Sequence, residues 1–360
     1  MNLPAWRELF CTGGTEPDFT LPLSVVRKHG APLVLLPPEH ALAARALDLY
    51  PAQTLQARAA RGLLRGALRA GWPVPLGRFA GPVHEAAPFA RFLRALAGGR
   101  WPGFAVLLGN PRTPGQRWLV LVFAPDGAPQ FVVKAGVGSA ACALIDAELA
   151  ALDAIPRSTA GVPLVRERWT GANAAAFALD YIGGSSPRVP DDDGELARIL
   201  ESWIDPTRRV TLADIPAWQC VRAASADAGA IEQALAGRTF HPAIFHGDFA
   251  PWNVKAVGDE WTVLDWERGS PAGVPAWDWF HFVIQPALLV RRLPPEQVFA
   301  RIAALLRSAA FQRYAASAEI AEFTGELLRG YLLYMLEVVR PADGLAELRA
   351  LRDLALQPPR

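Results

Sequence analysis

A pair of short apolar runs joined by a turn constrains this chain more than any other feature. Residues 254–257 and 261–264 have strand character, and Gly258-Asp259-Glu260 between them predicts a three-residue hairpin turn. The open ends of a hairpin lie together, so Asn253 and Asp265, which flank the two runs, should sit about 4.8 Å apart on neighbouring strands. An amide oxygen and a carboxylate at that spacing suit Mg²⁺, which completes its shell with substrate phosphates.

A third polar residue precedes the hairpin. Asp248 lies five residues before Asn253, in the loop segment FHGDFAPWNV. A carboxylate there can orient and deprotonate a substrate hydroxyl beside the metal, and phosphoryl transfer asks little more of a protein than positioning and charge neutralisation. The spacing HxDxxxxN, followed by a strand-ending Asp, is typical of kinase folds. It predicts Asp248 as the catalytic residue, with Asn253 and Asp265 as metal ligands.

This segment resembles the catalytic loop of the aminoglycoside phosphotransferase and choline kinase-like superfamily, which shares the protein-kinase fold. His246-Gly247-Asp248 stands where protein kinases have His-Arg-Asp, and Asp265-Trp266-Glu267 stands where they have Asp-Phe-Gly. A later aspartate that braces the loop is usual in the superfamily, and Asp278 fits it. The resemblance implies transfer of the γ-phosphate of ATP or GTP, with Mg²⁺, to a hydroxyl of a small-molecule or glycan-type substrate.

The resemblance extends upstream to about Trp101 and implies a nucleotide site. Its third strand would be residues 131–134, where Lys134 would hold the α- and β-phosphates. A partner acid should follow on the next helix, which offers Asp146 and Glu148, and the longer side chain favours Glu148. The strand 177–182 would be the hinge, with backbone groups at Asp180 and Ile182 bonding the base.

The phosphate loop departs from the kinase pattern. Residues 109–115 read GNPRTPG rather than G-x-G-x-x-G, and proline removes backbone N–H donors. Arg112, Thr113 or Arg117 could compensate.

These features predict an α+β, bilobal, protein-kinase-like fold. Residues 101–183 would form an antiparallel-sheet N-lobe with one helix, and residues 184–360 a helical C-lobe that carries the catalytic loop. Residues 1–100 are expected to form an N-terminal extension, with short strand-like runs followed by helical stretches at 39–49 and 53–70.

Composition excludes several other classes. Of 360 residues 51% are apolar, and the net charge of +1 gives no reason to expect nucleic-acid binding. Three scattered cysteines predict neither a zinc site nor disulfides and fit a cytoplasmic protein. No run is apolar enough for a transmembrane segment. The expected partners are therefore a nucleotide and an unidentified hydroxyl-bearing substrate.

Two charged clusters have alternative interpretations. Arg58, Arg61, Arg65 and Arg69 recur at helical spacing and could contact a membrane surface or another anionic partner, or form a solvated face. The acidic run Asp191-Asp192-Asp193 could attract a cationic substrate, or favour a helix N-terminus through the dipole.

Two functions compete with the phosphotransferase. A non-catalytic pseudokinase would keep the fold as a scaffold, and the proline-bearing phosphate loop favours it. A metal-dependent phosphohydrolase could be built on His246, Asp248 and Asp265. His246 and His281 are otherwise expected to be structural residues.

Overall fold

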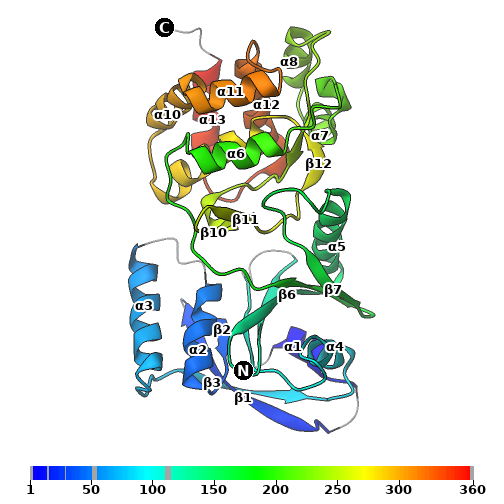
Figure 1. Ribbon diagram of the computed structural model, residues 1–360, viewed down its shortest axis with the longest axis vertical. Coiled ribbons are helices and arrows are strands. Elements are labelled where there is room, and N and C mark those ends of the chain that lie inside the picture. The colour runs from blue at the N-terminus through cyan, green and yellow to red at the C-terminus, as the bar shows by residue number, and fades with distance from the viewer. Residues whose placement is uncertain (1–2, 14–15, 29, 51–54, 110–114, 357–360) are drawn as a thin grey trace. The chain divides into compact units, whose positions relative to one another are not determined.

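The computed structural model describes residues 3–13, 16–28, 30–50, 55–109 and 115–356. The chain divides into two compact units, and the division falls within helix α5. Unit 1 comprises Met1–Leu149 and Pro163–Ile182, and unit 2 comprises Ala150–Val162 and Gly183–Arg360. Figure 1 shows the sheet in the first part of the chain and a mainly helical second part. The fold class is therefore α+β, as the sequence predicts.

Unit 1 is built on one eight-stranded sheet in the order β3-β1-β2-β4-β5-β6-β8-β7, and every neighbouring pair is antiparallel. Its strands are β1 Phe19–Lys28, β2 Ala31–Leu36, β3 Gly77–Val83, β4 Phe104–Leu107, β5 Arg117–Phe123, β6 Pro129–Val137, β7 Val165–Thr170 and β8 Ala174–Asp180. Its helices are α1 Pro4–Phe10, α2 His40–Ala46, the 3₁₀ turn η1 Leu47–Leu49, α3 Leu55–Arg69, α4 Pro88–Leu96 and α5 Ser139–Ala154.

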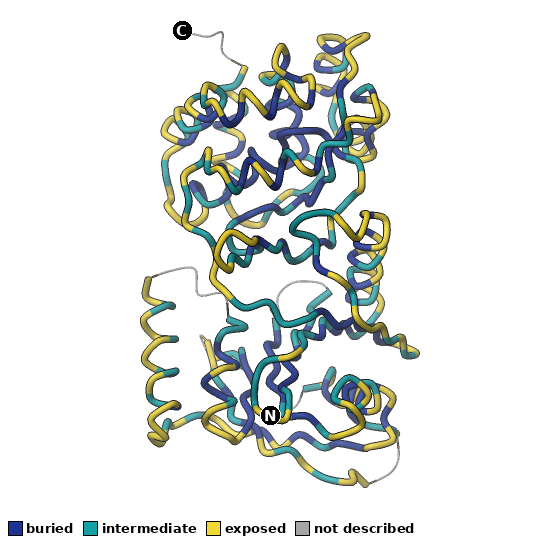
Figure 2. The backbone as a smooth tube through the Cα atoms, viewed as in Figure 1, coloured by how far each residue is buried: buried dark blue, intermediate teal, exposed yellow. Residues whose placement is uncertain are grey.

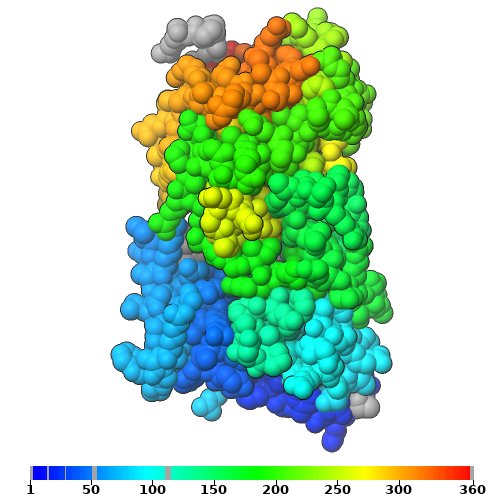
Figure 3. All heavy atoms as spheres, viewed as in Figure 1, coloured from blue at the N-terminus to red at the C-terminus, as the bar shows by residue number. Residues whose placement is uncertain are grey.

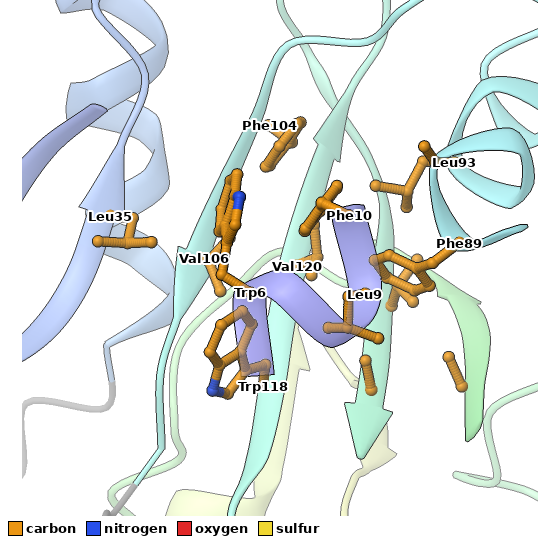
Figure 4. Packing of buried hydrophobic residues seen from close by; sticks show 14 of the residues in the cluster. Trp6, Leu9, Phe10, Leu35, Phe89, Leu93, Phe104, Val106, Trp118 and Val120 are labelled. Atoms are coloured by element: carbon orange, nitrogen blue, oxygen red, sulfur yellow. The ribbon is translucent and has the colours of Figure 1, made fainter. Parts of the chain in front are cut away.

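Apolar residues cover both faces of this sheet because side chains alternate along each strand. On β5, Trp118, Val120 and Val122 belong to one buried cluster, whereas Leu121 and Phe123 belong to another. Helices α1 and α4 pack on the first face, where Figure 4 shows the aromatic rings of α1 over the central strands. Helices α2 and α3 supply the second cluster.

Residues 1–100 do not form a separate extension. Strand β2 pairs with β4, so the three N-terminal strands continue the sheet that begins at residue 104. The two helical stretches expected in this region are present as α2 with η1, and α3. The strand-like runs find their partners across the chain, which local sequence patterns do not specify.

Unit 2 is mainly helical. Its helices are α6 Gly194–Ser202, α7 Pro216–Ala224, α8 Ala228–Ala234, α9 Trp277–Gln285, α10 Pro295–Arg307, α11 Ala309–Ser317, α12 Thr324–Leu333 and α13 Leu345–Ala355. Two π-helical segments, η4 Pro286–Val290 and η5 Tyr334–Val339, extend α9 and α12, and two 3₁₀ turns lie at η2 Leu212–Asp214 and η3 Pro251–Asn253. Strand β9 Ala243–Phe245 pairs with β12 Ser270–Gly273, and β10 Val254–Val257 pairs with β11 Glu260–Val263.

Helix α9 is the central element of unit 2, and all nine of its residues are buried. Figure 2 shows burial concentrated within this unit and exposure on its outer helices. Among the residues that the structure describes, no helix combines the length and the apolar character needed to cross a bilayer.

Candidate functional site

The β10–β11 hairpin brings the predicted metal ligands to one place. Val254 pairs with Val263, and beyond that pair the Leu264 amide donates to the Asn253 carbonyl at 2.7 Å. Asn253 therefore lies beside the residue that precedes Asp265. The turn at the other end differs from the three-residue turn expected, because Val257 pairs with Glu260 and leaves only two residues between the strands. Gly258 takes a φ of 59° there, which glycine adopts without strain.

Asn253 links the hairpin to the Asp248 loop. Its Nδ2 donates to the Asp248 carbonyl at 2.8 Å and to Asp248 Oδ2 at 3.0 Å. These bonds fix which end of the amide faces Asp248. The amide oxygen then points elsewhere and has the right chemistry to be a ligand for a hard cation.

Asp265 has an unusual backbone conformation. Its φ of 74° lies in the left-handed region, which L-residues other than Asn and Asp rarely adopt. Such conformations persist when the surrounding structure imposes them, and they concentrate at functional sites. Here the conformation follows the last residue of the hairpin ladder, so it sets the direction of the Asp265 side chain.

The donor set at the hairpin fits Mg²⁺ bound together with phosphates. Asn253 and Asp265 offer one amide oxygen and one carboxylate, and Mg²⁺ takes one or two carboxylates and fills its shell with water and phosphate oxygens. Within the described part of the chain, no group of three or more His, Cys, Asp and Glu residues could hold a metal by itself. The residues present thus suit a metal that arrives with a nucleotide better than a closed protein site.

His246 holds the loop through both of its ring nitrogens. Its Nε2 lies 3.0 Å from the Leu264 carbonyl, which can only accept, so Nε2 carries the hydrogen. The other nitrogen, Nδ1, accepts from the Asp248 backbone amide at 3.2 Å. Burial lowers the pKa of His246 to about 4, so the ring is neutral near pH 7. With both nitrogens engaged, His246 is a structural residue, as expected, and it is not available as a metal ligand.

Asp278 braces the same loop from α9. Its Oδ2 accepts from the His246 amide at 2.7 Å and its Oδ1 from the Gly247 amide at 3.0 Å. Gly247 has a φ of 79°, so the loop turns sharply at the position that Asp278 holds. Burial raises the pKa of Asp278 to about 7, although the two backbone donors act in the opposite direction.

His281 is the residue that sequence reasoning missed. It was expected to be structural, yet its Nε2 lies 3.0 Å from Asp248 Oδ1, and its Nδ1 lies 3.1 Å from the Tyr331 hydroxyl. A sequence signal exists for it. Asp278, His281 and Gln285 recur at i, i+3 and i+7 on a helix whose other residues are apolar, so all three lie on one face.

The surroundings of Asp248 favour its ionised form. Burial is the largest single influence and acts to raise the pKa of this carboxyl, but the hydrogen bond with His281 and the electrostatic interactions with His281, His246 and Arg268 together outweigh it. The net effect is a pKa below the usual value. The side chain is 33% exposed, so a carboxylate at this position remains accessible to a substrate.

In unit 1 the structure brings Lys134 and Glu148 together. Lys134 lies on β6, between β5 and β8, and its Nζ is 2.5 Å from Glu148 Oε2 on α5. The side chains are 12% and 1% exposed, respectively, so the pair is almost fully removed from water. Of the two acids considered on this helix, it is Glu148 that meets the lysine.

The predicted hinge residues lie at the end of β8. The Tyr181 amide donates to the Gln130 carbonyl at 2.8 Å, so the backbone of Tyr181 faces β6. Backbone groups alternate in direction along a strand, so those of Asp180 and Ile182 face the other side, where the pairing of β7 ends at Leu179. The Asp180 side chain pairs with Arg166 of β7.

Residues 110–114 of the proline-bearing phosphate loop, with Arg112 and Thr113, lie outside the described residues. Its flanks, Gly109 and Gly115, have φ values of 69° and 76°. A Cβ on Gly109 would meet the Arg117 carbonyl oxygen at 2.5 Å, so the chain approaches itself closely there.

Both charged clusters are partly used within the fold. Arg65 pairs with Asp48 of η1 at 2.7 Å, and Arg61 donates to the carbonyl of Tyr50, the residue after η1, at 2.9 Å, so two of the four arginines on α3 have partners within unit 1. Asp193 caps α6 by accepting from the Glu195 amide at 2.9 Å, and Asp191 pairs with Arg301 at 2.5 Å. The cap agrees with the interpretation of the acidic run as a helix N-terminus, whereas Arg61 and Arg65 are paired within the protein rather than forming a purely solvated face. Figure 3 shows α3, in blue, at the surface of unit 1.

Comparisons with known proteins describe what this chain is similar to. No family model matches the sequence. No curated protein matches it either. Similar solved structures include a thermostable mutant of aminoglycoside phosphotransferase APH(4)-Ia in ternary complex with ADP and hygromycin B, with 15% identity, a TM-score of 0.46, and coverage of 74% of this chain and 96% of the other.

Two further solved structures are aminoglycoside phosphotransferase APH(3'')-Id from Streptomyces rimosus and a glucosamine kinase. The first has 15% identity and a TM-score of 0.40, and the match covers 72% of this chain and 97% of the other. The second has 18% identity and a TM-score of 0.35, and the match covers 78% and 87%.

Proposed function

We propose that this protein is a phosphotransferase that moves the γ-phosphate of ATP or GTP to a hydroxyl of a small-molecule or glycan-type substrate. One observation carries the proposal: Asn253 donates to the Asp248 carboxylate, and its own carbonyl accepts from Leu264, the residue before Asp265. A carboxylate for the acceptor hydroxyl and two oxygen ligands for a metal–phosphate complex are the parts that this chemistry requires.

Each residue has a defined role in this proposal. Asp248 orients the acceptor hydroxyl and takes its proton, and its lowered pKa keeps it ionised for that purpose. Asn253 and Asp265 would hold Mg²⁺, which supplies charge neutralisation to the phosphates when it is bound. Lys134, tied to Glu148, would bind the α- and β-phosphates, and the backbone at Asp180 and Ile182 would bond the base.

The competing functions have less support. A phosphohydrolase built on His246 needs a free ring nitrogen, and both nitrogens of His246 are engaged. A pseudokinase has no need of a carboxylate held by two side chains, which Asp248 has. The acceptor is open, and the similar proteins suggest a first panel of hygromycin B, glucosamine and other hydroxyl-bearing sugars.

The decisive experiment is thermal unfolding with and without nucleotide and Mg²⁺. At about 100 times the dissociation constant, a ligand adds roughly 2.7 kcal/mol to the free energy of unfolding. We expect a Mg²⁺-dependent shift in wild type that Asp265→Ala loses. Asp259→Ala, at the exposed opposite end of the same hairpin, is the matched control and should retain it.

The outcomes separate the three functions. No shift with either nucleotide would favour the pseudokinase. The hydrolase would be favoured by a different pair of results. Nucleotide and Mg²⁺ would raise the unfolding temperature, and the protein would release inorganic phosphate without phosphorylating any compound of the panel. Phosphorylation of any panel member, lost in Asp265→Ala but retained in Asp259→Ala, would establish the phosphotransferase.

A further inference from the structure

Helix α9 carries a polar face inside the protein. Asp278, His281 and Gln285 are 5%, 3% and 4% exposed, and every other residue of the helix is apolar. Burying a polar side chain costs free energy unless it makes compensating hydrogen bonds. A row of three such residues on one buried face therefore calls for a specific set of partners.

Two of these three residues, Asp278 and His281, find their partners in the Asp248 loop. Asp278 takes the backbone amides of His246 and Gly247, and one turn further along α9 His281 reaches the Asp248 side chain. The helix thus holds the loop at two points, the backbone amides of His246 and Gly247 and the side-chain carboxylate of Asp248. A structural role alone would be complete with the Asp278 contacts.

Both oxygens of the Asp248 carboxylate are held by different elements. His281 Nε2 lies 3.0 Å from Oδ1, and Asn253 Nδ2 lies 3.0 Å from Oδ2. Two donors on opposite oxygens fix the rotation of the carboxylate about its last bond. Each oxygen keeps further lone pairs, and the side chain is one-third exposed, so it can still accept from a hydroxyl.

A second buried residue sets the state of the imidazole. A carboxylate oxygen can only accept, so His281 Nε2 carries the hydrogen in the contact with Asp248. At the other nitrogen, the Tyr331 hydroxyl lies 3.1 Å from Nδ1. Burial raises the pKa of Tyr331, which therefore keeps its proton and can donate it to an Nδ1 that carries no hydrogen.

We propose that His281 is a positioning residue for the phosphotransfer reaction, and that Tyr331 holds it in the Nε2–H tautomer. This inference rests on the proposed function of Asp248. His281 keeps the Asp248 carboxylate in the single orientation from which it can receive the acceptor proton. A displacement of about 1 Å in a reacting group can lower a rate by about 100-fold, so a hydrogen bond that fixes the group matters to kcat.

Three substitutions test the role. His281→Phe keeps a ring but removes the donor, and kcat should fall about 10- to 100-fold with the KM for nucleotide nearly unchanged. His281→Gln places an amide donor near the position of Nε2 and should restore at least a third of the wild-type kcat. Tyr331→Phe keeps His281 and should lower kcat by about 3- to 10-fold, because both tautomers then become available.

The split between kcat and KM separates positioning from folding. A purely structural role predicts that His281→Phe and His281→Gln lose kcat and thermal stability together, and that result would overturn the proposal. Equal kcat in all three variants and wild type, measured on any acceptor of the panel, would also overturn it.

A readout that needs no turnover addresses the geometry directly. In protein labelled with ¹⁵N-histidine, the ring couplings of His281, assigned by their absence in His281→Gln, should show the Nε2–H tautomer, and Tyr331→Phe should change them. An Nδ1–H tautomer would contradict the hydrogen-bond chain. An intact Nε2–H signal in a protein that phosphorylates no acceptor would instead count against the proposed function, and with it against a catalytic use of His281.

Discussion

The two units hold their polar residues in different ways. In unit 2 the Asp248 loop is tied by His246, Asn253, Asp278 and His281, which come from the loop itself, the hairpin and helix α9. In unit 1 the Lys134 ammonium meets Glu148 in a nearly dry ion pair. A group with several supports should tolerate the loss of one of them, whereas a buried pair depends on both partners. A substitution in the Asp248 loop of unit 2 should therefore affect mainly catalysis, whereas a substitution in the buried pair of unit 1 should affect mainly folding stability.

The largest effect should come from the residue at the centre of the supported loop. Asp248→Asn keeps the size of the side chain but removes the base, and we expect kcat to fall by more than about 1,000-fold. The fold should survive, because the surrounding supports remain. The measurement is turnover on the first acceptor found, together with nucleotide binding by thermal shift.

Asp259→Asn, on the exposed turn of the hairpin, is the control and should behave as wild type. If Asp248→Asn unfolded the protein, the loop would depend on Asp248 itself for its stability. The proposed difference between the multiply supported loop of unit 2 and the buried pair of unit 1 would then be wrong.

The buried pair in unit 1 should respond in the opposite way. Lys134→Met leaves the Glu148 carboxylate, 1% exposed, without its partner, and breaking a buried pair costs about 3–5 kcal/mol of unfolding free energy. The double variant Lys134→Met/Glu148→Leu replaces the pair by apolar groups and should recover most of that stability. It should not recover nucleotide binding, because the ammonium is still absent.

Urea unfolding followed by tryptophan fluorescence measures these changes. Lys28→Met, at an exposed lysine of β1, is the control, and it should alter stability by less than about 0.5 kcal/mol. A double variant as unstable as Lys134→Met would mean that the loss of stability does not come from the unpaired charge on Glu148.

The same contrast explains what the sequence could predict. The loop and the two predicted metal ligands of unit 2 lie within twenty residues of one another, from His246 to Asp265, so spacing and a local hairpin predict that they come together. The Lys134–Glu148 pair also follows from a strand and the next helix.

The strands of the first hundred residues could not be placed in this way. Val34 of β2 pairs with Leu107 of β4 across more than seventy positions, and no local pattern encodes such a partner. His281 was missed for a different reason. A lone histidine on an apolar helix suggests packing, and only the spacing of Asp278, His281 and Gln285 indicates a polar face.

One support of the loop predicts a pH dependence of stability. The pKa of His246 is about 4 in the fold and 6.5 ordinarily, so between these values the unfolded chain binds a proton that the folded chain does not. This contribution is complete above pH 6.5 and is lost as the pH falls towards 4. Its full size is on the order of 3 kcal/mol.

Asp278 acts with the opposite sign. Its pKa is raised from 3.8 to about 7, so between these pH values the folded chain binds a proton that the unfolded chain does not, and stability falls as the pH rises.

A comparison of wild type with His246→Gln isolates the contribution of the histidine. Urea unfolding at pH 7 and pH 4.5 should show the stability of wild type relative to this variant decreasing by about 2–3 kcal/mol at the lower pH. A constant difference between wild type and variant would mean that His246 is protonated as readily in the fold as in the unfolded chain.

The smallest effect should come from an ion pair that lacks burial. Arg65 and Asp48 lie 2.7 Å apart, much like Lys134 and Glu148, but their side chains are 31% and 29% exposed. Water competes for both groups, and such pairs contribute at most about 1 kcal/mol. Arg65→Met should therefore lower the free energy of unfolding by less than about 1 kcal/mol, only slightly more than Arg69→Met on the exposed face of the same helix. A loss of about 3 kcal/mol or more of unfolding free energy in Arg65→Met would contradict this expectation. The exposed Arg65–Asp48 pair would then matter to stability as much as the buried Lys134–Glu148 pair.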